Sequence, residues 1–211
     1  MTVAVYLESG AKRVFACAVD WPGWARSGQD ADAALAALLA SAPRYAPIAA
    51  AAGFSFPERS PLEVVERLQG NATTDFGAPG VIRKADAESL TGAHAQRLVA
   101  LVEASWAALD RAAAKAPEIL RKGPRGGGRD RSEIVAHVVD AERLYARGLG
   151  LRAPAVDPLD RAAVATLRRR LSAALLTEPD EPARWPRRFA ARRIAWHVLD
   201  HAWEIADRGS G

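Results

Sequence analysis

Two histidines four residues apart stand near the C-terminus, in a stretch that predicts a helix. His197 and His201 lie within residues 192–208, where no Pro or Gly interrupts the chain, and Gly209 follows as a stop signal. Residues four apart project from the same face of a helix, one turn above the other. Two imidazoles placed in this way can bind one divalent cation, with Zn–N distances of about 2.0–2.1 Å.

The helical face that carries these histidines continues with Glu204 and borders an apolar stripe. At 100° per residue, Glu204 lies within about 60° of His201, and Arg208 falls between them. The neighbouring stripe consists of Ile194, Val198 and Ile205. Histidines between a core stripe and a polar strip indicate a lined cavity. Glu204 is a fourth ligand or an acceptor that orients an imidazole, and a surface pair with Arg208 is the alternative.

A pair of histidines makes a poor metal site, because a stable zinc site has at least three protein ligands. The third candidate is His137, within residues 131–148, where apolar residues recur at helical spacing. Asp130 with Glu133 fits a capping box at the start of this helix. An imidazole in an apolar stripe needs partners for its ring nitrogens, and a metal ion is one candidate. We place His94, which lies among small and polar residues, at the surface.

The order and helical context of these histidines resemble the DinB superfamily. The resemblance covers roughly residues 86–208, and the phrase Trp-His-Val-Leu-Asp-His-Ala-Trp-Glu is similar to actinobacterial DinB-like proteins. It implies a four-helix bundle with a three-histidine metal site at His137, His197 and His201. It also implies one of two activities, either metal-dependent hydrolysis or transfer or isomerisation with a low-molecular-weight thiol such as mycothiol.

Three histidine ligands leave the fourth position of a tetrahedral metal open, which is typical of catalytic zinc sites. Neutral imidazoles suit several divalent metals; we expect zinc, with nickel or iron as alternatives. A histidine-only site is cationic, so it favours a thiolate or hydroxide at that position, and we expect a thiol or another small-molecule substrate. Trp196 and Trp203 lie seven residues apart on one side of the helix and either wall this pocket or pack in the core.

Start and stop signals in the sequence predict the other two helices of the bundle. One is predicted over residues 86–116, and the other from Asp157-Pro158 to about residue 176. The Gly-rich stretch 122–129 lacks the Gly-Lys-Ser/Thr of a phosphate-binding loop, so we interpret it as a flexible connection.

The N-terminal part predicts a small mixed module. Residues 3–7 and 13–19 are apolar, β-rich runs around a turn and predict a hairpin. A helix is predicted over residues 30–42, and residues 62–68 form either a third strand or a short helix. This ββαβ order, with the phrase Val-Asp-Trp-Pro-Gly-Trp-Ala-Arg-Ser-Gly-Gln-Asp, resembles the HicB-like fold over about residues 1–70. HicB antitoxins usually add a DNA-binding module, and here the bundle takes its place.

The predicted fold class is therefore α+β, with a HicB-like ββαβ module followed by a DinB-like four-helix bundle. We expect the module at residues 1–70, a linker at 71–85 and the bundle at 86–211. The turn-forming composition of the middle segment favours a boundary there. The sequence leaves open whether the chain forms a homodimer.

Composition excludes several classes of protein. The net charge is +4, but the arginines are spread over several predicted helices and mixed with 25 acidic residues, so we expect no specific nucleic-acid partner. No apolar run reaches the roughly 20 residues that span a bilayer, and the N-terminus lacks a signal-peptide pattern. The single cysteine, Cys17, suits a reducing cytoplasm and is expected to be a small buried residue.

Two classes of function follow. One is a metalloenzyme, with a thiol-dependent transferase or isomerase ahead of a hydrolase. The other is a non-catalytic binding protein, in which the HicB-like module engages a partner protein and the bundle serves as its scaffold. Stoichiometric metal distinguishes them, because a scaffold does not need it.

Overall fold

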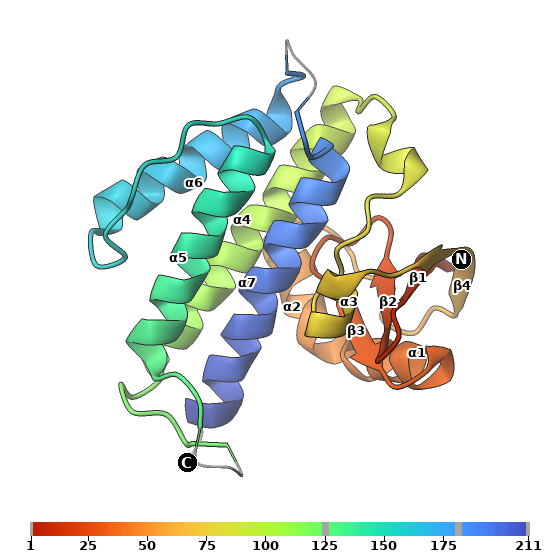
Figure 1. The fold of residues 1–211 in the computed structure, drawn as a ribbon, viewed down its shortest axis with the longest axis horizontal. Helices are drawn as coiled ribbons and strands as arrows, with labels where there is room; N and C mark the ends of the chain where they lie inside the picture. Colours follow the sequence, from red (N-terminus) through yellow and green to blue (C-terminus); the bar gives the residue numbers. More distant parts are fainter. Residues whose placement is uncertain (1, 124–126, 180–182, 210–211) are drawn as a thin grey trace.

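A small sheet module lies beside a bundle of long helices (Figure 1). The computed structural model describes residues 2–123, 127–179 and 183–209. The sheet comes first in the chain and the long helices follow, which confirms the predicted mixed α+β class. Its four strands are β1 (Val3–Ser9), β2 (Val14–Ala18), β3 (Ala25–Gly28) and β4 (Leu62–Gln69).

The sheet has the strand order β3-β2-β1-β4. β1 and β2 pair antiparallel, and the Gly10 N–H donates to the Arg13 carbonyl at 2.9 Å in the turn between them, so the predicted hairpin is confirmed. β4 pairs parallel to β1, which selects the strand alternative for this segment. A parallel partner requires a crossover, and two helices supply it.

Those two helices show where the predicted ββαβ order is incomplete. The structure contains α1 (Ala31–Ala40) and α2 (Ala42–Ala51), and β3 lies before them. β3 is short and has no β-branched residue, so it leaves no pattern in the sequence; its pairing with β2 creates it. α2 carries Pro43 in its first turn, where no N–H is needed, and accommodates Pro47 further on. Among the described residues no single helix suffices to cross a membrane, although α1 and α2 pass that test jointly as a bent pair.

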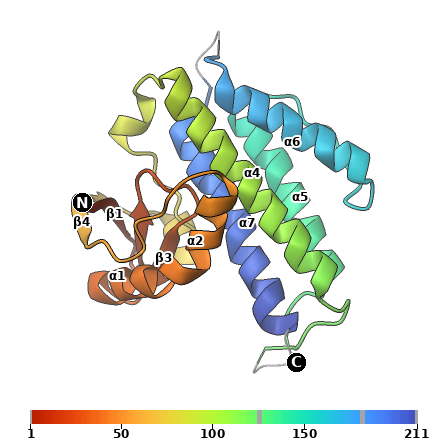
Figure 2. The ribbon, with the colours of Figure 1, turned by 180° about the vertical axis from the view of Figure 1, so that it is seen from behind.

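The bundle consists of α4 (Gly92–Lys115), α5 (Arg131–Gly148), α6 (Arg161–Leu176) and α7 (Arg187–Gly209). α4 and α7 lie side by side and run in the same direction, and α5 runs opposite to both (Figures 1 and 2). A crossover at residues 149–160 leads from α5 to α6. Figure 2 shows α2 lying against α4, so the module contacts the bundle through helices as well as through its sheet.

The ends of the bundle helices differ from the predicted ones. α4 begins at Gly92 rather than at residue 86, because Thr91 caps it through the His94 N–H (3.3 Å). α6 begins three residues after Pro158, because Asp160 accepts from the N–H groups of the first turn. α7 extends five residues further toward its N-terminus than predicted, to Arg187. Residues 124–126, in the predicted flexible connection, lie outside the described residues.

The segment between module and bundle contains α3 (Ala72–Phe76) and the 3₁₀ turn η1 (Lys84–Ala87). Glu8 of β1, which is fully buried, accepts hydrogen bonds from the Thr74 hydroxyl (2.5 Å) and from the Gly80 and Val81 N–H groups (2.9 and 3.1 Å). Three donors offset the cost of burying this carboxylate. The segment therefore packs onto the sheet, and the domain boundary within it stays a prediction.

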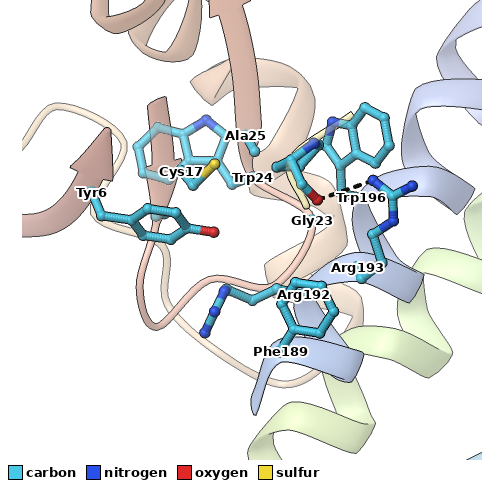
Figure 3. A pocket seen from close by; sticks show the side chains of 11 residues that line it. Tyr6, Cys17, Gly23, Trp24, Ala25, Phe189, Arg192, Arg193 and Trp196 are labelled. Carbon is cyan, nitrogen blue, oxygen red and sulfur yellow. Dashed lines mark hydrogen bonds between the residues drawn. The ribbon is translucent and has the colours of Figure 1, made fainter. Parts of the chain in front are cut away.

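A buried ion pair joins this segment to α7. Asp86 and Arg192 are both nearly inaccessible, with an O···N distance of 2.6 Å. The guanidinium carbons of Arg192 and Arg83 lie 5.3 and 5.2 Å from the centre of the Tyr6 ring, so two cations flank one aromatic ring of β1. Beside Arg192 is a cavity of about 10 Å³, room for about one water molecule, and Figure 3 shows the Tyr6 hydroxyl pointing into it.

The apolar cluster of the module extends onto two bundle helices, while the bundle has a larger cluster of its own. Trp24 and Tyr45 of the module form a single cluster with Leu101 of α4 and with Leu199 and Trp203 of α7. The turn before β3 comes close to α7 at Gly23, which has a φ of 92°. A Cβ at this position would collide with the Leu199 side chain, so only glycine allows this approach. α7 thus packs against the module on one side and α5 on another, where its histidines lie.

Candidate metal centre

The start of α5 is fixed by the predicted capping box. The Asp130 N–H donates to a Glu133 carboxylate oxygen at 2.8 Å, and the Asp130 side chain accepts from the N-terminal turn. Ile134 and Val138 then face the core, while His137 lies half-buried between them and the surface. The helix is predicted over the same residues that form it, so the position of His137 follows from local sequence signals.

α5 and α7 bring three histidines together. His137 projects from α5, and His197 and His201 project from successive turns of α7. The ring centres lie 4.6 Å apart for the pair on α7 and 5.0 Å from His137 for each of them. One ring nitrogen from each residue lies within 4.8 Å of the other two. The three predicted ligands therefore converge.

The nitrogen separation fits a metal ion. His137 Nε2 and His197 Nε2 are 3.2 Å apart. Two nitrogens bound to a tetrahedral zinc at about 2.0–2.1 Å lie about 3.3 Å from each other. The donor set, three nitrogens on two facing helices of a bundle, is one that divalent transition metals accept. The three histidines therefore fit a divalent transition metal ion.

Glu204 contacts the site through His201. One carboxylate oxygen lies 2.8 Å from His201 Nδ1, and the other accepts from Arg208 Nη1 at 2.5 Å. A carboxylate at Nδ1 favours the proton on that nitrogen and leaves Nε2 with a free lone pair. With both oxygens engaged, Glu204 has the geometry of an orienting acceptor rather than of a fourth ligand, and its predicted pair with Arg208 is formed as well.

Burial keeps the imidazoles of His137 and His197 uncharged. Desolvation, followed by the neighbouring His201 and His137, lowers the pKa of His197 to about 2. Desolvation, Arg129 and His201 also lower the pKa of His137. Only a neutral imidazole has a lone pair for a metal, so both residues are in the binding form at neutral pH. His197 Nδ1 is buried and has no hydrogen-bond partner among the described residues. No protein hydrogen bond therefore offsets the cost of removing this nitrogen from water.

An aromatic ring and a cation that the sequence did not assign to the site lie next to His197. The Tyr145 ring packs edge-on against the imidazole at 5.7 Å between centres. The Arg193 guanidinium lies 5.7 Å from the Tyr145 ring, and its Nη1 donates to the Pro79 carbonyl at 3.0 Å. Tyr145 is one of the apolar residues that recur at helical spacing along α5. No local signal indicates that Arg193 reaches this ring, because the approach depends on how α5 packs on α7.

The two tryptophans of α7 pack at the junction with the module. Trp196 meets Phe15 edge-on, with 5.9 Å between ring centres. Trp203 lies under the Arg26 guanidinium at 4.0 Å, and Arg26 also approaches Asp200 at 3.5 Å. The core-packing alternative for both tryptophans is therefore the one that forms.

Two cavities lie away from the histidines. The small one is at the module junction (Figure 3). The other is an open groove of about 800 Å³, lined by Leu149, Trp185 and Arg187 where α5 ends and α7 begins. His94, at the start of α4, is exposed as expected. His137 and His201 are only partly buried, so these two histidines are reached from the surface.

No family model matches the chain, and neither a curated protein nor a solved structure matches it. The layout, a small sheet followed by a helical bundle with three neighbouring histidines, is compatible with a DinB-like arrangement. The DinB-like and HicB-like assignments remain resemblances of sequence pattern. Any function for this protein consequently rests on the geometry of the site itself.

Proposed function

We propose that the protein binds one divalent metal ion through His137, His197 and His201 and is a thiol-dependent transferase or isomerase. The observation that supports this most directly is the convergence of three imidazoles from two helices. When bound, such a metal acts as a Lewis acid at its open position, where it favours the deprotonated form of a thiol or water. We propose zinc first, with nickel or iron as alternatives.

The surrounding residues support binding of an anionic group. His197 is buried and uncharged, so the three ligands do not offset the charge of a divalent ion. The carboxylate of Glu204 is hydrogen-bonded to His201 and paired with Arg208, whose positive charge already offsets its negative charge. A thiolate is therefore attracted to the site by an uncompensated positive charge. Tyr145 and Arg193, on the other side of His197, add an aromatic surface and a second cation.

The same contacts favour thiol chemistry over hydrolysis. In metalloproteases with a His-x-x-x-His pair, hydrolysis uses a carboxylate as a general base, free to accept a proton from the attacking water. Both oxygens of Glu204 are engaged, one by His201 and one by Arg208. A thiol needs no such base, because it binds as a thiolate and its proton passes to solvent. Metal-dependent hydrolysis is thus the second candidate, and a non-catalytic binding protein the third.

The test has two steps on the full-length protein. Elemental analysis should find one divalent metal per chain; a protein without stoichiometric metal contradicts the proposal and leaves the binding-protein alternative. The cobalt-substituted protein is then titrated with mycothiol and with 2-mercaptoethanol while its absorption spectrum is followed. We expect a thiolate-to-cobalt charge-transfer band with the thiols and none with ethylene glycol, the alcohol control. No spectral change with either thiol would exclude the transferase and leave hydrolysis or binding.

A further inference from the structure

The guanidinium of Arg208 lies between Glu204 and the connection from α4 to α5. Its Nη1 donates to Glu204 at 2.5 Å, one turn back along α7. Its Nε donates to the Arg121 carbonyl and its Nη2 to the Arg129 carbonyl, each at 2.8 Å. All three guanidinium nitrogens are therefore engaged, and they join one carboxylate to two points of the connection. A planar, three-nitrogen fork suits this arrangement, whereas a single ammonium group does not.

The described residues of this connection pack around that guanidinium. The Arg121 N–H donates to the Arg208 carbonyl at 3.1 Å, so the backbone of α7 holds it too. Gly128 has a φ of 128°, and a Cβ built there would lie 2.7 Å from Arg208 Nη2. Lys122 donates to the Gly128 carbonyl at 3.1 Å and to Asp130, the cap of α5, at 2.6 Å. The end of α7 and the start of α5 are thereby tied together next to the histidines that each carries.

Glu204 links Arg208 to the metal site, because its carboxylate contacts both Arg208 and His201. Its side chain is about one-third exposed, so a free carboxylate there would sample several rotamers. Arg208 holds one oxygen, and the other faces His201 Nδ1 at 2.8 Å. An acceptor fixed at Nδ1 sets both the tautomer and the orientation of the ring.

We propose that Arg208 is a positioning residue of the metal centre, which fixes Glu204 and through it the Nδ1–H tautomer of His201. The effect depends on the connection, because the carbonyls of Arg121 and Arg129 hold the guanidinium in place. The inference rests on the proposed metal site. It adds that metal affinity is coupled to the conformation of a surface connection that contributes no ligand. Loss of an outer partner of a ligating histidine lowers metal affinity by about 10–100-fold.

Two readouts on the full-length protein test this. The affinity for Co²⁺ is measured by competition with a chelator. The tautomer of each imidazole is measured in the metal-free protein by ¹⁵N NMR of labelled histidine. Arg208→Ala should weaken Co²⁺ binding by about tenfold, the lower end of that range, and should give His201 a mixed tautomer. Arg208→Lys should restore only part of both, because lysine reaches Glu204 without the planar fork. Gly128→Ala, which perturbs the guanidinium from the other side, should change both readouts in the same direction.

The matched control is Arg44→Ala. Arg44 of α2 donates two hydrogen bonds to the Asp207 carboxylate, at 2.9 Å each. Asp207 lies on the same last turn of α7 as Arg208, but this pair does not involve Glu204. This variant should leave Co²⁺ affinity and the His201 tautomer unchanged; an equal loss would mean that fraying of the helix end, not positioning, is responsible.

A folded Arg208→Ala protein with wild-type affinity and tautomer overturns the proposal. If Arg208→Ala does not fold, Arg208→Lys and Gly128→Ala decide it by the same readouts. If the wild-type protein binds no Co²⁺, the proposed function fails, and the tautomer comparison still decides whether Arg208 positions His201.

Discussion

His137 Nε2 and His197 Nε2 lie 3.2 Å apart, on helices whose histidines are 60 residues apart in the chain. Two neutral imidazoles approach this closely either through an N–H···N hydrogen bond or around a shared cation. A nitrogen of His201 lies in the same small space. A hydrogen bond serves only two of these rings, whereas one cation serves all three. The geometry therefore favours a metal ion at the centre.

His197→Ala and His137→Ala should each lose stoichiometric metal, because two remaining histidines do not make a stable site. Elemental analysis after gel filtration measures the metal, and circular dichroism checks that each variant is folded. His94→Ala is the control: this residue is exposed at the start of α4, and its removal should leave the metal content unchanged. A folded His197→Ala protein with wild-type metal content would show that the assignment is wrong.

Trp203→Ala should destabilise the protein by about 3–5 kcal/mol, as expected for truncation of a buried tryptophan. The side chain is 9% exposed and joins module and bundle in one cluster beneath Arg26. Urea unfolding gives the free energy of unfolding. Phe76→Ala is the matched aromatic control, since Phe76 is 89% exposed and its loss should change stability by less than about 0.5 kcal/mol. Equal effects of the two substitutions would contradict a shared core.

Asp86→Ala should cost about 3–5 kcal/mol, because it leaves Arg192 buried without its counter-charge. Asp207→Ala removes an ion pair of similar geometry with Arg44, but the Asp207 side chain is 60% exposed. Solvent screens such a pair, so the expected cost is only about 0.2–1 kcal/mol. Thermal and urea unfolding of the two variants compares them directly; similar losses would mean that burial does not set the strength of the first pair.

Cys17 should be almost unreactive in the folded protein. Burial, with the nearby Glu8 as the next cause, raises the pKa of its thiol to about 12. Because the thiolate is the reactive form, alkylation by iodoacetamide at pH 8 should be slow in the native protein and fast in urea. A folded pKa above the unfolded one also means that Cys17 contributes stability below the unfolded pKa, which is lost as pH rises toward 12. Mass spectrometry of the alkylated protein measures the rate; equal rates in both states would contradict burial of the thiol.

The sequence by itself determined the elements whose signals are local. The two apolar, β-rich runs around a turn predicted the hairpin, and the Asp130–Glu133 capping box predicted the start of α5. The four-residue spacing of His197 and His201 placed both on one face of α7, as it must in any helix. These features depend on residues within a few positions of one another, which is why a single chain sufficed to predict them.

Tertiary structure decided the features that depend on distant segments. β3 exists because β2 offers it hydrogen bonds, and the guanidinium of Arg208 is held beside Glu204 by carbonyls of the connection from α4 to α5. The contact of Arg208 with Arg129 spans 79 residues and leaves no periodic pattern in the chain. Spacing along a helix determines which side chains share a face. Only the packing of α5, α7 and the module determines what that face meets, because those contacts join residues that no local pattern connects.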